Sequence, residues 1–423
     1  MLENIFKNEF KNLNQAQKQA VETIYDPIMV VAGPWTWKTQ IIALRTANII
    51  LKTWIKPENI LITTFTESWV IAIKKRLIKF LWQDGYRVKV TTFHAFCSEV
   101  ITDFPEKFLN QRAKQSIDDI ESYEILSDIL DENIKNWDIK ELFSTNDRFS
   151  YLRDIKDRIS KLKTESITPE KFDLIISNQQ ENFEKKLKDL ETNKRIRDLE
   201  KRTKKDREVY DKQITKLKEL NLIYKEYNTK IRDLWLYDFA DMIQFVVNKF
   251  EKDEEILAYY AEKFQFLMID EFQDTNNSQN KVIDLILWYN KQEQNILVVW
   301  DDDQSIYRFQ WANIENMLDF VSKYPNTQMI VLEENYRSSQ DILDLSKNLI
   351  SNNNQRISNK IDLINKDLIA SWENKDKKEN NFYILENDIK EKLFIYNEIK
   401  RLYSKDKTFA IIVTKRKLKK YAI

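Results

Sequence analysis

The sequence predicts an α/β fold in which a parallel, doubly wound sheet is interrupted by a helical insertion. Short β-rich apolar runs recur along the chain, and most of them are flanked by helical patterns. Alternating strands and helices are typical of a parallel sheet with helices on both faces. Between about residues 105 and 232 the chain instead consists of long, Lys-, Glu- and Asp-rich helical sequence with almost no β-branched runs. This stretch is therefore expected to be an insertion in the sheet domain.

The first predicted strand sets the context of the candidate site. It covers residues 27–32, ends in a short loop and is followed by a helical pattern. This strand, loop and helix order is the one that a phosphate-binding loop requires. Comparable apolar runs follow along the chain. They cover residues 60–65, 88–93, 266–270 and 295–299, and the β pattern resumes at residues 329–332 and 409–413.

Composition excludes several classes of protein. Lys+Arg and Asp+Glu both number 68 in a chain of 423 residues, so any affinity for nucleic acid must come from local patches. Cys97 and His94 are each the only residue of their type, which excludes a disulfide framework and a His/Cys zinc cluster within this chain. No apolar run approaches the ~18 residues that a membrane helix needs, and the N-terminus lacks the apolar core of a signal peptide. We therefore expect a soluble, cytoplasmic protein without a membrane partner.

The loop after the first strand is almost a Walker A phosphate loop. The chain has only 2 Gly against 11 Trp, whereas ordinary proteins contain roughly 7% Gly. Gly at positions 35 and 37 would complete the motif, because Gly allows a tight turn and lets phosphate oxygens approach the backbone N–H groups. The candidate nucleotide-binding residues of this loop are Ala32, Gly33, Pro34, Trp35, Thr36, Trp37, Lys38 and Thr39.

The simplest hypothesis for the Trp residues is that UGA encodes Gly in the source organism and is translated as Trp in this sequence. Some bacterial lineages read UGA in that way. Four Trp lie inside motifs that otherwise stand intact, namely Trp35, Trp37, Trp300 and Trp311. The alternative is that the Trp are real and the phosphate site is inactive. Neutral decay, however, would scatter substitutions among many residue types.

Two motifs carry the chemistry of phosphoryl transfer. Lys38 would hold the β- and γ-phosphates of ATP, and the hydroxyl of Thr39 would bind Mg²⁺. Asp270 and Glu271 directly follow an apolar run, as expected for a Walker B carboxylate that holds Mg²⁺ beside a general base. Two ordinary solvated acids at a strand end are the alternative, which the joint spacing of the motifs disfavours. ATP and Mg²⁺ are therefore the expected cofactors.

With these two motifs, the chain resembles the UvrD/Rep/PcrA family of superfamily 1 DNA helicases. The resemblance extends to the family's Q motif, two early DNA-contacting motifs, the segment that returns from the insertion, motif III and motif IV. These are residues 13–21, 64–66, 92–96, 236–242, 299–312 (with Gly at 300 and 311) and 332–339. The resemblance implies a RecA-like P-loop lobe with a helical insertion, followed by the start of a second RecA-like lobe.

The resemblance also implies roles in ATP hydrolysis. Gln17 would recognise adenine, and Tyr336 would stack on the same base. Gln304 would sense the γ-phosphate and pass its presence to the DNA-binding edge. Arg337, on the second lobe, would act as an arginine finger that stabilises charge on the transferred phosphoryl group.

Four residues are implied to bind DNA. Tyr307 and Phe309 would stack on unpaired bases, a contact worth ~1–3 kcal/mol per base. Core packing is the alternative for these two aromatic residues. Phe65 and His94 lie in the early DNA-contacting motifs, although His94 could equally be a buried, satisfied imidazole.

The chain departs from the family pattern at several points. Residues 67 and 68 are Glu and Ser where the family usually has Asn and Lys, and motif III has Gln310 in place of Arg. Motifs V and VI have no counterpart, so we expect an N-terminal part of a longer protein. The expected division is a first lobe over residues 1–105 and 233–327, a helical insertion over 106–232 and a truncated second lobe over 328–423.

The sequence therefore predicts an ATP- and Mg²⁺-dependent DNA helicase and translocase that acts on single-stranded and partly duplex DNA in repair or replication. One alternative is the motor of a recombination helicase–nuclease, which shares these motifs. Another is a catalytically dead DNA-binding scaffold, which is expected if the Trp are real. The sequence gives no indication of protein partners.

Overall fold

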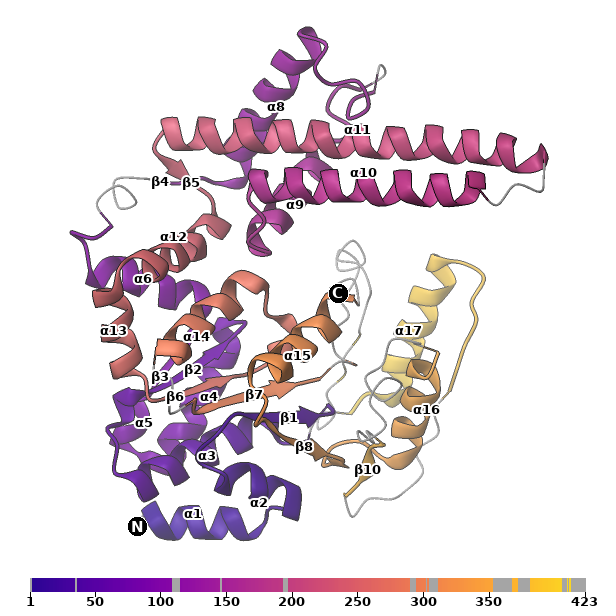
Figure 1. Cartoon of the computed structure of the whole chain (residues 1–423). Helices are drawn as coiled ribbons and strands as arrows, with labels where there is room; N and C mark the ends of the chain where they lie inside the picture. Colours follow the sequence, from indigo (N-terminus) through magenta and orange to yellow (C-terminus); the bar gives the residue numbers. More distant parts are fainter. Residues whose placement is uncertain are drawn as a thin grey trace.

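The predicted α/β fold is confirmed by the structure, a computed structural model of the chain (Figure 1). It describes residues 2–34, 36–108, 115–144, 147–192, 197–289, 294–301, 303, 311–352, 367–371, 381–404, 409 and 411. Within these residues, six strands form one fully parallel sheet in the order β3-β2-β6-β7-β1-β8. The strands are β1 Ile28–Ala32, β2 Ile60–Thr64, β3 Lys89–Thr92, β6 Phe266–Ile269, β7 Ile296–Trp300 and β8 Gln328–Leu332.

Two apolar cores cover the two faces of this sheet, because alternate residues of each strand point to opposite faces. Val30 and Val299 contribute to one core, whereas Val31 and Val298 contribute to the other. The first face packs against α1 Leu2–Lys11, α2 Gln15–Glu22, α3 Lys38–Thr53 and α4 Glu67–Leu81. The second packs against α6 Phe93–Asp103, α12 Phe239–Lys252, α13 Glu254–Lys263, α14 Asn277–Tyr289 and α15 Trp311–Lys323. Short helices α5 Gln83–Arg87, η1 Pro57–Asn59 and η2 Phe272–Asp274 lie in the connections.

A group of helices with its own core occupies the stretch whose charged composition predicts an insertion. It contains α8 Asp119–Lys135, α9 Leu152–Thr164, α10 Pro169–Thr192 and α11 Arg197–Asp233. The long helices α10 and α11 lie side by side and project beyond the sheet domain (Figure 1). Two short strands, β4 Gln115–Ser116 and β5 Leu236–Tyr237, pair in parallel where the chain leaves and re-enters the sheet domain.

The boundary expected at residue 328 is wrong in one respect. The strand over residues 328–332 belongs to the first sheet, because β8 pairs in parallel with β1 along its whole length, from Ile28↔Gln328 to Ala32↔Leu332. Beyond it lie β9 Glu334–Asn335, α16 Gln340–Ile350, β10 Ile369–Ala370 and α17 Asp388–Leu402. The strand expected over 409–413 lies almost wholly outside the described residues.

Several Trp residues have a backbone conformation that favours Gly. Among the described residues, eight non-Gly residues have a positive φ, and five of these are Trp. They are Trp37 (66°), Trp54 (59°), Trp82 (51°), Trp137 (64°) and Trp235 (58°). Side chains other than those of Asn and Asp are rare in this region, because Cβ approaches the backbone too closely.

No helix in the described part of the chain is long and apolar enough to cross a membrane.

Candidate nucleotide-binding site and adjoining groove

The loop over residues 33–37 connects the carboxyl end of β1 to the amino end of α3. Thr36 Oγ1 donates a hydrogen bond to the carbonyl oxygen of Gly33 at 2.9 Å, which closes the loop on itself. Trp37 is the N-cap of α3, with φ 66° and ψ 30°, and makes no side-chain capping bond. Lys38 and Thr39 are the first two residues of α3 and are buried. The loop thus lies between strand and helix, where a phosphate loop is expected, and its backbone at position 37 suits Gly.

The Walker A and Walker B residues meet at the carboxyl edge of the sheet. Lys38 Nζ lies 3.1 Å from Glu271 Oε2 and 3.9 Å from Asp301 Oδ2. These three residues follow β1, β6 and β7, which are neighbouring parallel strands. Parallel strands bring their carboxyl ends to one edge, where ligands of open α/β sheets bind.

Asp270 has the environment of a cation ligand. Burial, and then the negative charge of Glu271, raise the pKa of Asp270 to about 7, and Lys38 opposes this shift. Its Oδ1 accepts a hydrogen bond from the Glu271 N–H at 3.1 Å, whereas its Oδ2 is buried without a hydrogen-bond partner among the described residues. A buried, unpaired carboxylate oxygen fits a hard cation such as Mg²⁺.

Within the described residues, no group of three or more His, Cys, Asp or Glu side chains could hold a metal ion. Mg²⁺ is commonly bound by one or two protein groups together with the phosphates of its substrate. Asp270 and Thr39 are therefore sufficient candidates for its protein ligands.

Gln273 connects the general-base candidate to the neighbouring strand. Its Nε2 donates to Glu271 Oε2 at 2.6 Å, and its Oε1 accepts from the Asp301 N–H at 2.9 Å. Both Gln273 and Asp301 are buried. Sequence reasoning assigned neither residue a role, although each lies inside a segment that was recognised as a motif.

A second cluster of side chains contacts the phosphate loop. Gln17 is buried on α2, where it forms a reciprocal capping box with Asn14. Its Nε2 donates to the Thr36 carbonyl oxygen at 3.3 Å, and its Oε1 accepts from the Tyr336 hydroxyl at 3.4 Å. The Tyr336 and Trp37 rings stack with their centroids 4.4 Å apart. The indole thus covers a face of the ring that is expected to stack on adenine.

The segment after β8 is tied to the phosphate loop by Asn335. Its Nδ2 donates to the Pro34 carbonyl oxygen at 2.8 Å. Its Oδ1 accepts from the backbone N–H groups of Arg337 and Ser338 at 2.9 and 2.7 Å. Arg337 lies on the turn that this amide forms, and its side chain is exposed.

A groove with a volume of about 1060 Å³ adjoins the Walker B residues. Its walls come from the carboxyl edge of the sheet, the N-terminus of α12 and the helix α9 of the insertion. The lining residues are Phe65, Thr66, Trp69, His94, Ser160, Lys161, Thr164, Phe239, Ala240, Glu271, Gln273, Asp274, Asn276, Gln279 and Asp303. Because Glu271 and Gln273 belong to it, the groove is continuous with the candidate nucleotide site.

Exposed aromatic rings mark this groove. The side chains of Phe65 and Phe239 are 58% and 61% exposed. The Phe239 ring stacks on the His94 imidazole with a centroid distance of 3.7 Å. Burial lowers the pKa of His94 to about 4, against the opposing effect of a hydrogen bond with the Phe239 backbone. The imidazole is therefore neutral near pH 7 and offers stacking and hydrogen bonds rather than a positive charge.

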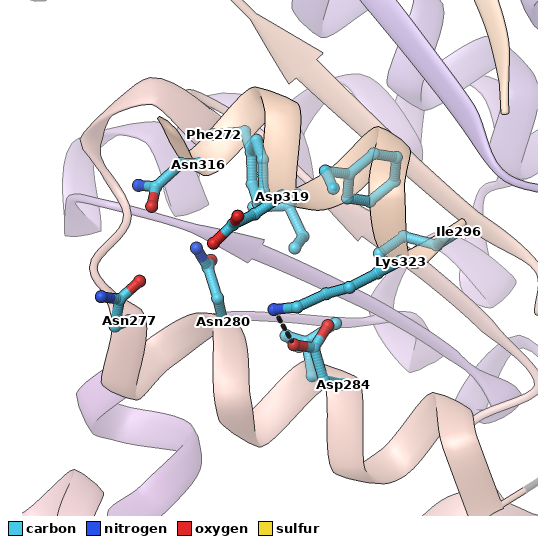
Figure 2. A pocket seen from close by; sticks show the side chains of 11 residues that line it. Phe272, Asn277, Asn280, Asp284, Ile296, Asn316, Asp319 and Lys323 are labelled. Carbon is cyan, nitrogen blue, oxygen red and sulfur yellow. Dashed lines mark hydrogen bonds and ion pairs between the residues drawn. The ribbon is translucent and has the colours of Figure 1, made fainter. Parts of the chain in front are cut away.

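A much smaller cavity of about 20 Å³ lies between α14 and α15 (Figure 2). Lys323 Nζ is 2.7 Å from Asp284 Oδ2, and the Tyr324 hydroxyl donates to Asp284 Oδ1 at 2.9 Å. Asn280 Oδ1 is buried without a hydrogen-bond partner among the described residues. The volume and this oxygen suit one water molecule, since a water needs about 10–15 Å³. We assign this cavity a packing role.

Comparison with known proteins identifies the family. The profile described as "UvrD/REP helicase N-terminal domain" matches residues 13–325. The chain belongs to the UvrD/REP helicase family. The match covers the six-stranded sheet apart from β8, together with the helical insertion.

Curated relatives in this family are named ATP-dependent DNA helicase PcrA. The protein of Bacillus subtilis (strain 168) is 28% identical over 396 residues, which are 93% of this chain and 46% of the relative. A Staphylococcus epidermidis protein is 29% identical over 346 residues, which are 82% of this chain and 41% of the relative. The chain therefore matches less than half the length of these relatives.

The structure brings together most residues that resemblance to the UvrD/REP family had indicated. Lys38, Thr39, Asp270 and Glu271 lie at one edge, Gln17 and Tyr336 contact each other beside the loop, and Phe65 and His94 line the groove. Trp35, Gln304, Tyr307 and Phe309 lie outside the described residues. Phe239 was missed, although its segment was recognised, because only the fold places its ring on His94.

Proposed function

We propose that the chain is the ATP-hydrolysing and DNA-contacting part of a UvrD/REP-type DNA helicase that depends on ATP and Mg²⁺. The observation that carries this proposal is the meeting of Lys38, Asp270 and Glu271 at the sheet edge, in direct continuity with an aromatic groove. A nucleotide bound at this edge would contact Glu271, which also lines the groove. Hydrolysis could therefore alter the walls that contact DNA.

The roles of the residues follow from their positions. Lys38 would bind the β- and γ-phosphates, and Glu271, held by Gln273, would accept a proton from the attacking water. Thr39 and Asp270 would hold Mg²⁺, which when bound supplies positive charge that offsets the phosphate oxygens. Arg337 would stabilise the same charge from beyond β8.

Adenine would be bound by Gln17 and Tyr336. Gln17 already bridges the Thr36 carbonyl oxygen and the Tyr336 hydroxyl, so its amide lies between the loop and the ring. An adenine base in this position could stack on Tyr336 while the amide reads its polar edge. The γ-phosphate sensor would be Gln304, and Tyr307 and Phe309 would extend base stacking.

Single-stranded DNA is the proposed occupant of the groove. Phe65 and Phe239 offer exposed rings, and stacking of unpaired bases on such rings does not depend on sequence. Thr66 and Thr92 cap α4 and α6 with their side chains, so two helix N-termini adjoin the groove and favour phosphate. We place this activity in DNA repair or replication in the cytoplasm.

We infer further that Trp35, Trp37, Trp300 and Trp311 stand where the working protein has Gly. The left-handed φ of Trp37 supports this reading at one of these positions. At another, Trp300 is fully buried and its Nε1 has no hydrogen-bond partner among the described residues. A buried, unpaired N–H group costs roughly 1–3 kcal/mol. Gly would remove the backbone strain at position 37 and the unpaired N–H group at position 300. It would also remove the indole that stacks on the Tyr336 ring.

The test is calorimetric titration of ATP into the chain as printed and into a variant with Trp35→Gly and Trp37→Gly. We expect binding only in the variant, because Gly at these two positions lets phosphate oxygens approach the backbone N–H groups, which a large side chain obstructs. Trp54→Gly, which changes the C-cap residue at the far end of α3, is the matched control and should not create binding. Equal affinity in the printed chain and the double variant would contradict the proposed site. Mass spectrometry of the protein from its own organism would separately show Trp or Gly at each position.

A further inference from the structure

We propose that Lys163, at the C-terminal end of α9, is a positioning residue that holds the insertion wall of the groove in place for single-stranded DNA. The proposal rests on the proposed function, because it concerns the same groove. It assigns Lys163 no contact with DNA. Its side chain would act through the first turn of α12, which carries Phe239.

Lys163 is a buried cation with two carboxylate partners. Its side chain is 3% exposed, and its Nζ lies 2.6 Å from Asp238 Oδ2 and 2.9 Å from Asp241 Oδ1. The Tyr227 ring of α11 is also near, with its centroid 5.1 Å from Nζ. A buried charge is costly unless it is paired and hydrogen-bonded. The three charges therefore constrain α9 and α12 to one relative placement.

The partners of Lys163 form the N-cap of α12. Asp238 Oδ1 accepts from the N–H groups of Ala240 and Asp241 at 3.1 and 3.0 Å, and Asp241 Oδ2 accepts in return from the Asp238 N–H at 3.0 Å. This reciprocal box uses one oxygen of each acid, and Lys163 takes the other. The lysine thus fixes the first turn of α12 from the insertion side.

Phe239 lies inside this capped turn. It directly follows the N-cap residue Asp238, and its ring stacks on His94 in the groove. Ser160, Lys161 and Thr164 of α9 line the same groove. The Lys163 ion pairs therefore set both the position of an exposed stacking ring and the helix that faces it.

A second set of bonds links the end of α9 to α14. Ser278 Oγ donates to the carbonyl oxygens of Lys163 and Thr164 at 3.1 and 2.7 Å. Gln244 Nε2 donates to the Lys163 carbonyl oxygen at 3.1 Å and to Ser278 Oγ at 2.6 Å. Ser278 is in the first turn of α14, four residues after Asp274 of the Walker B segment. The same junction thus contacts the element that leaves the nucleotide site.

A purely structural ion pair is the competing explanation, and a functional readout separates the two. A structural role would lower stability and every activity together. A positioning role would weaken DNA binding and leave hydrolysis in the absence of DNA unchanged, because Lys38, Asp270 and Glu271 have no bond to Lys163 among the described contacts.

The test compares Lys163→Met, Lys163→Arg and the control Lys156→Met. Lys156 is on the same helix and makes an ion pair of 2.7 Å with the exposed Asp119. Affinity for a fluorescent oligo-dT is measured by anisotropy on the chain as printed. The ATPase constants are measured on the protein that carries Trp35→Gly and Trp37→Gly, with and without this DNA.

We expect Lys163→Met to weaken oligo-dT binding about tenfold, the effect of disturbing one stacked base. The kcat and the KM for ATP without DNA should change less than about twofold. Lys163→Arg should restore part of the affinity, and Lys156→Met should have no effect. The double variant Lys163→Met with Asp241→Asn removes one of the two carboxylates that lose their cation. The other, Asp238, keeps its hydrogen bonds from the N–H groups of residues 240 and 241, so the double variant should fold and still bind DNA weakly.

Unchanged DNA affinity in both Lys163→Met variants would overturn the proposal. A parallel loss of DNA-independent ATPase in the folded double variant would also overturn it, because that result indicates a general structural role. Failure of the proposed function is distinct from both outcomes. It would appear in the parent protein, before any change at Lys163, as absence of DNA binding and of ATPase activity.

Discussion

At the scale of single residues, the candidate site depends on a lysine that lies among buried acids. Lys38 contacts Glu271, and Asp270 keeps one carboxylate oxygen without a partner among the described residues. The roles of these residues can be predicted from the sequence, because each motif directly follows an apolar run that indicates a strand. Gln273, Asp301 and Phe239 could not be assigned roles in this way, since their roles depend on contacts between segments far apart in the chain.

Glu271→Gln should keep ATP binding and lose hydrolysis in the protein that carries Trp35→Gly and Trp37→Gly. The amide can still accept from Lys38 and Gln273, but it cannot take a proton from water. Loss of a general base lowers turnover by roughly 10²–10⁴-fold. Steady-state ATPase and calorimetric ATP affinity measure the two effects, with the exposed Glu255→Gln as control. A loss of affinity as large as the loss of turnover would argue against the base role.

Asp270→Asn should stabilise the Mg²⁺-free protein, and by more at pH 8 than at pH 5. The folded-state pKa is about 7, above the value of about 3.9 in an unfolded chain. The folded state thus binds the extra proton, so its stability falls as pH rises from about 4 to 7. Asn avoids this penalty. In urea unfolding with EDTA, Asp270→Asn should raise the free energy of unfolding by about 1–3 kcal/mol more at pH 8 than at pH 5. An exposed control, Asp138→Asn, should show no such difference between the two pH values.

At the scale of elements, the unusual Trp content is most evident at helix ends, where Trp stands at positions that favour Gly. Trp54 ends α3 and Trp82 ends α4, both with a positive φ. Helices very commonly end in a left-handed residue that is usually Gly. The sequence motifs had pointed to four other Trp, because composition alone does not reveal which positions have a left-handed backbone.

Trp82→Gly should therefore stabilise the protein, whereas Trp69→Gly in the same helix should not. Trp82 is the C-cap of α4, with φ 51° and ψ −119°, and Trp69 lies within the helix. A backbone conformation in a sparsely populated region with positive φ costs a non-Gly residue roughly 1–3 kcal/mol, and Gly inside a helix costs about 0.5–1 kcal/mol relative to Ala. Thermal unfolding midpoints should rise for Trp82→Gly and fall for Trp69→Gly. Shifts of the same sign would contradict this account of the helix end.

The strands show where prediction from sequence succeeds and where it stops. The apolar runs at 60–65 and 266–270 became β2 and β6 within about one residue at each end. The run at 329–332 was also a strand, but its partner is β1, which lies 300 residues earlier. A run of apolar residues indicates a buried strand without indicating its neighbour, so the domain boundary was placed too early.

At the scale of the whole molecule, the sheet domain and the remainder differ in how much they bury. Two continuous cores cover the faces of the six-stranded sheet. Beyond β8, Leu343 is the buried apolar residue of α16, and α17 buries none of its described side chains. Local stability depends on buried apolar contacts, so it should fall sharply after Leu332.

Hydrogen–deuterium exchange of the 423-residue chain should detect this difference. Amides of β1 and β7 should be protected to the level of global unfolding, because these strands are central and fully buried. Amides of α17 should exchange at least about tenfold faster than those of α3, although both are regular helices, because α17 opens without breaking a core. The bonds of Asn335 to Pro34 and of Tyr336 to Gln17 should give the turn after β9 intermediate protection. Equal protection of α17 and α3 would mean that the segment beyond β8 has a core of its own, and stability would then no longer follow burial in this molecule.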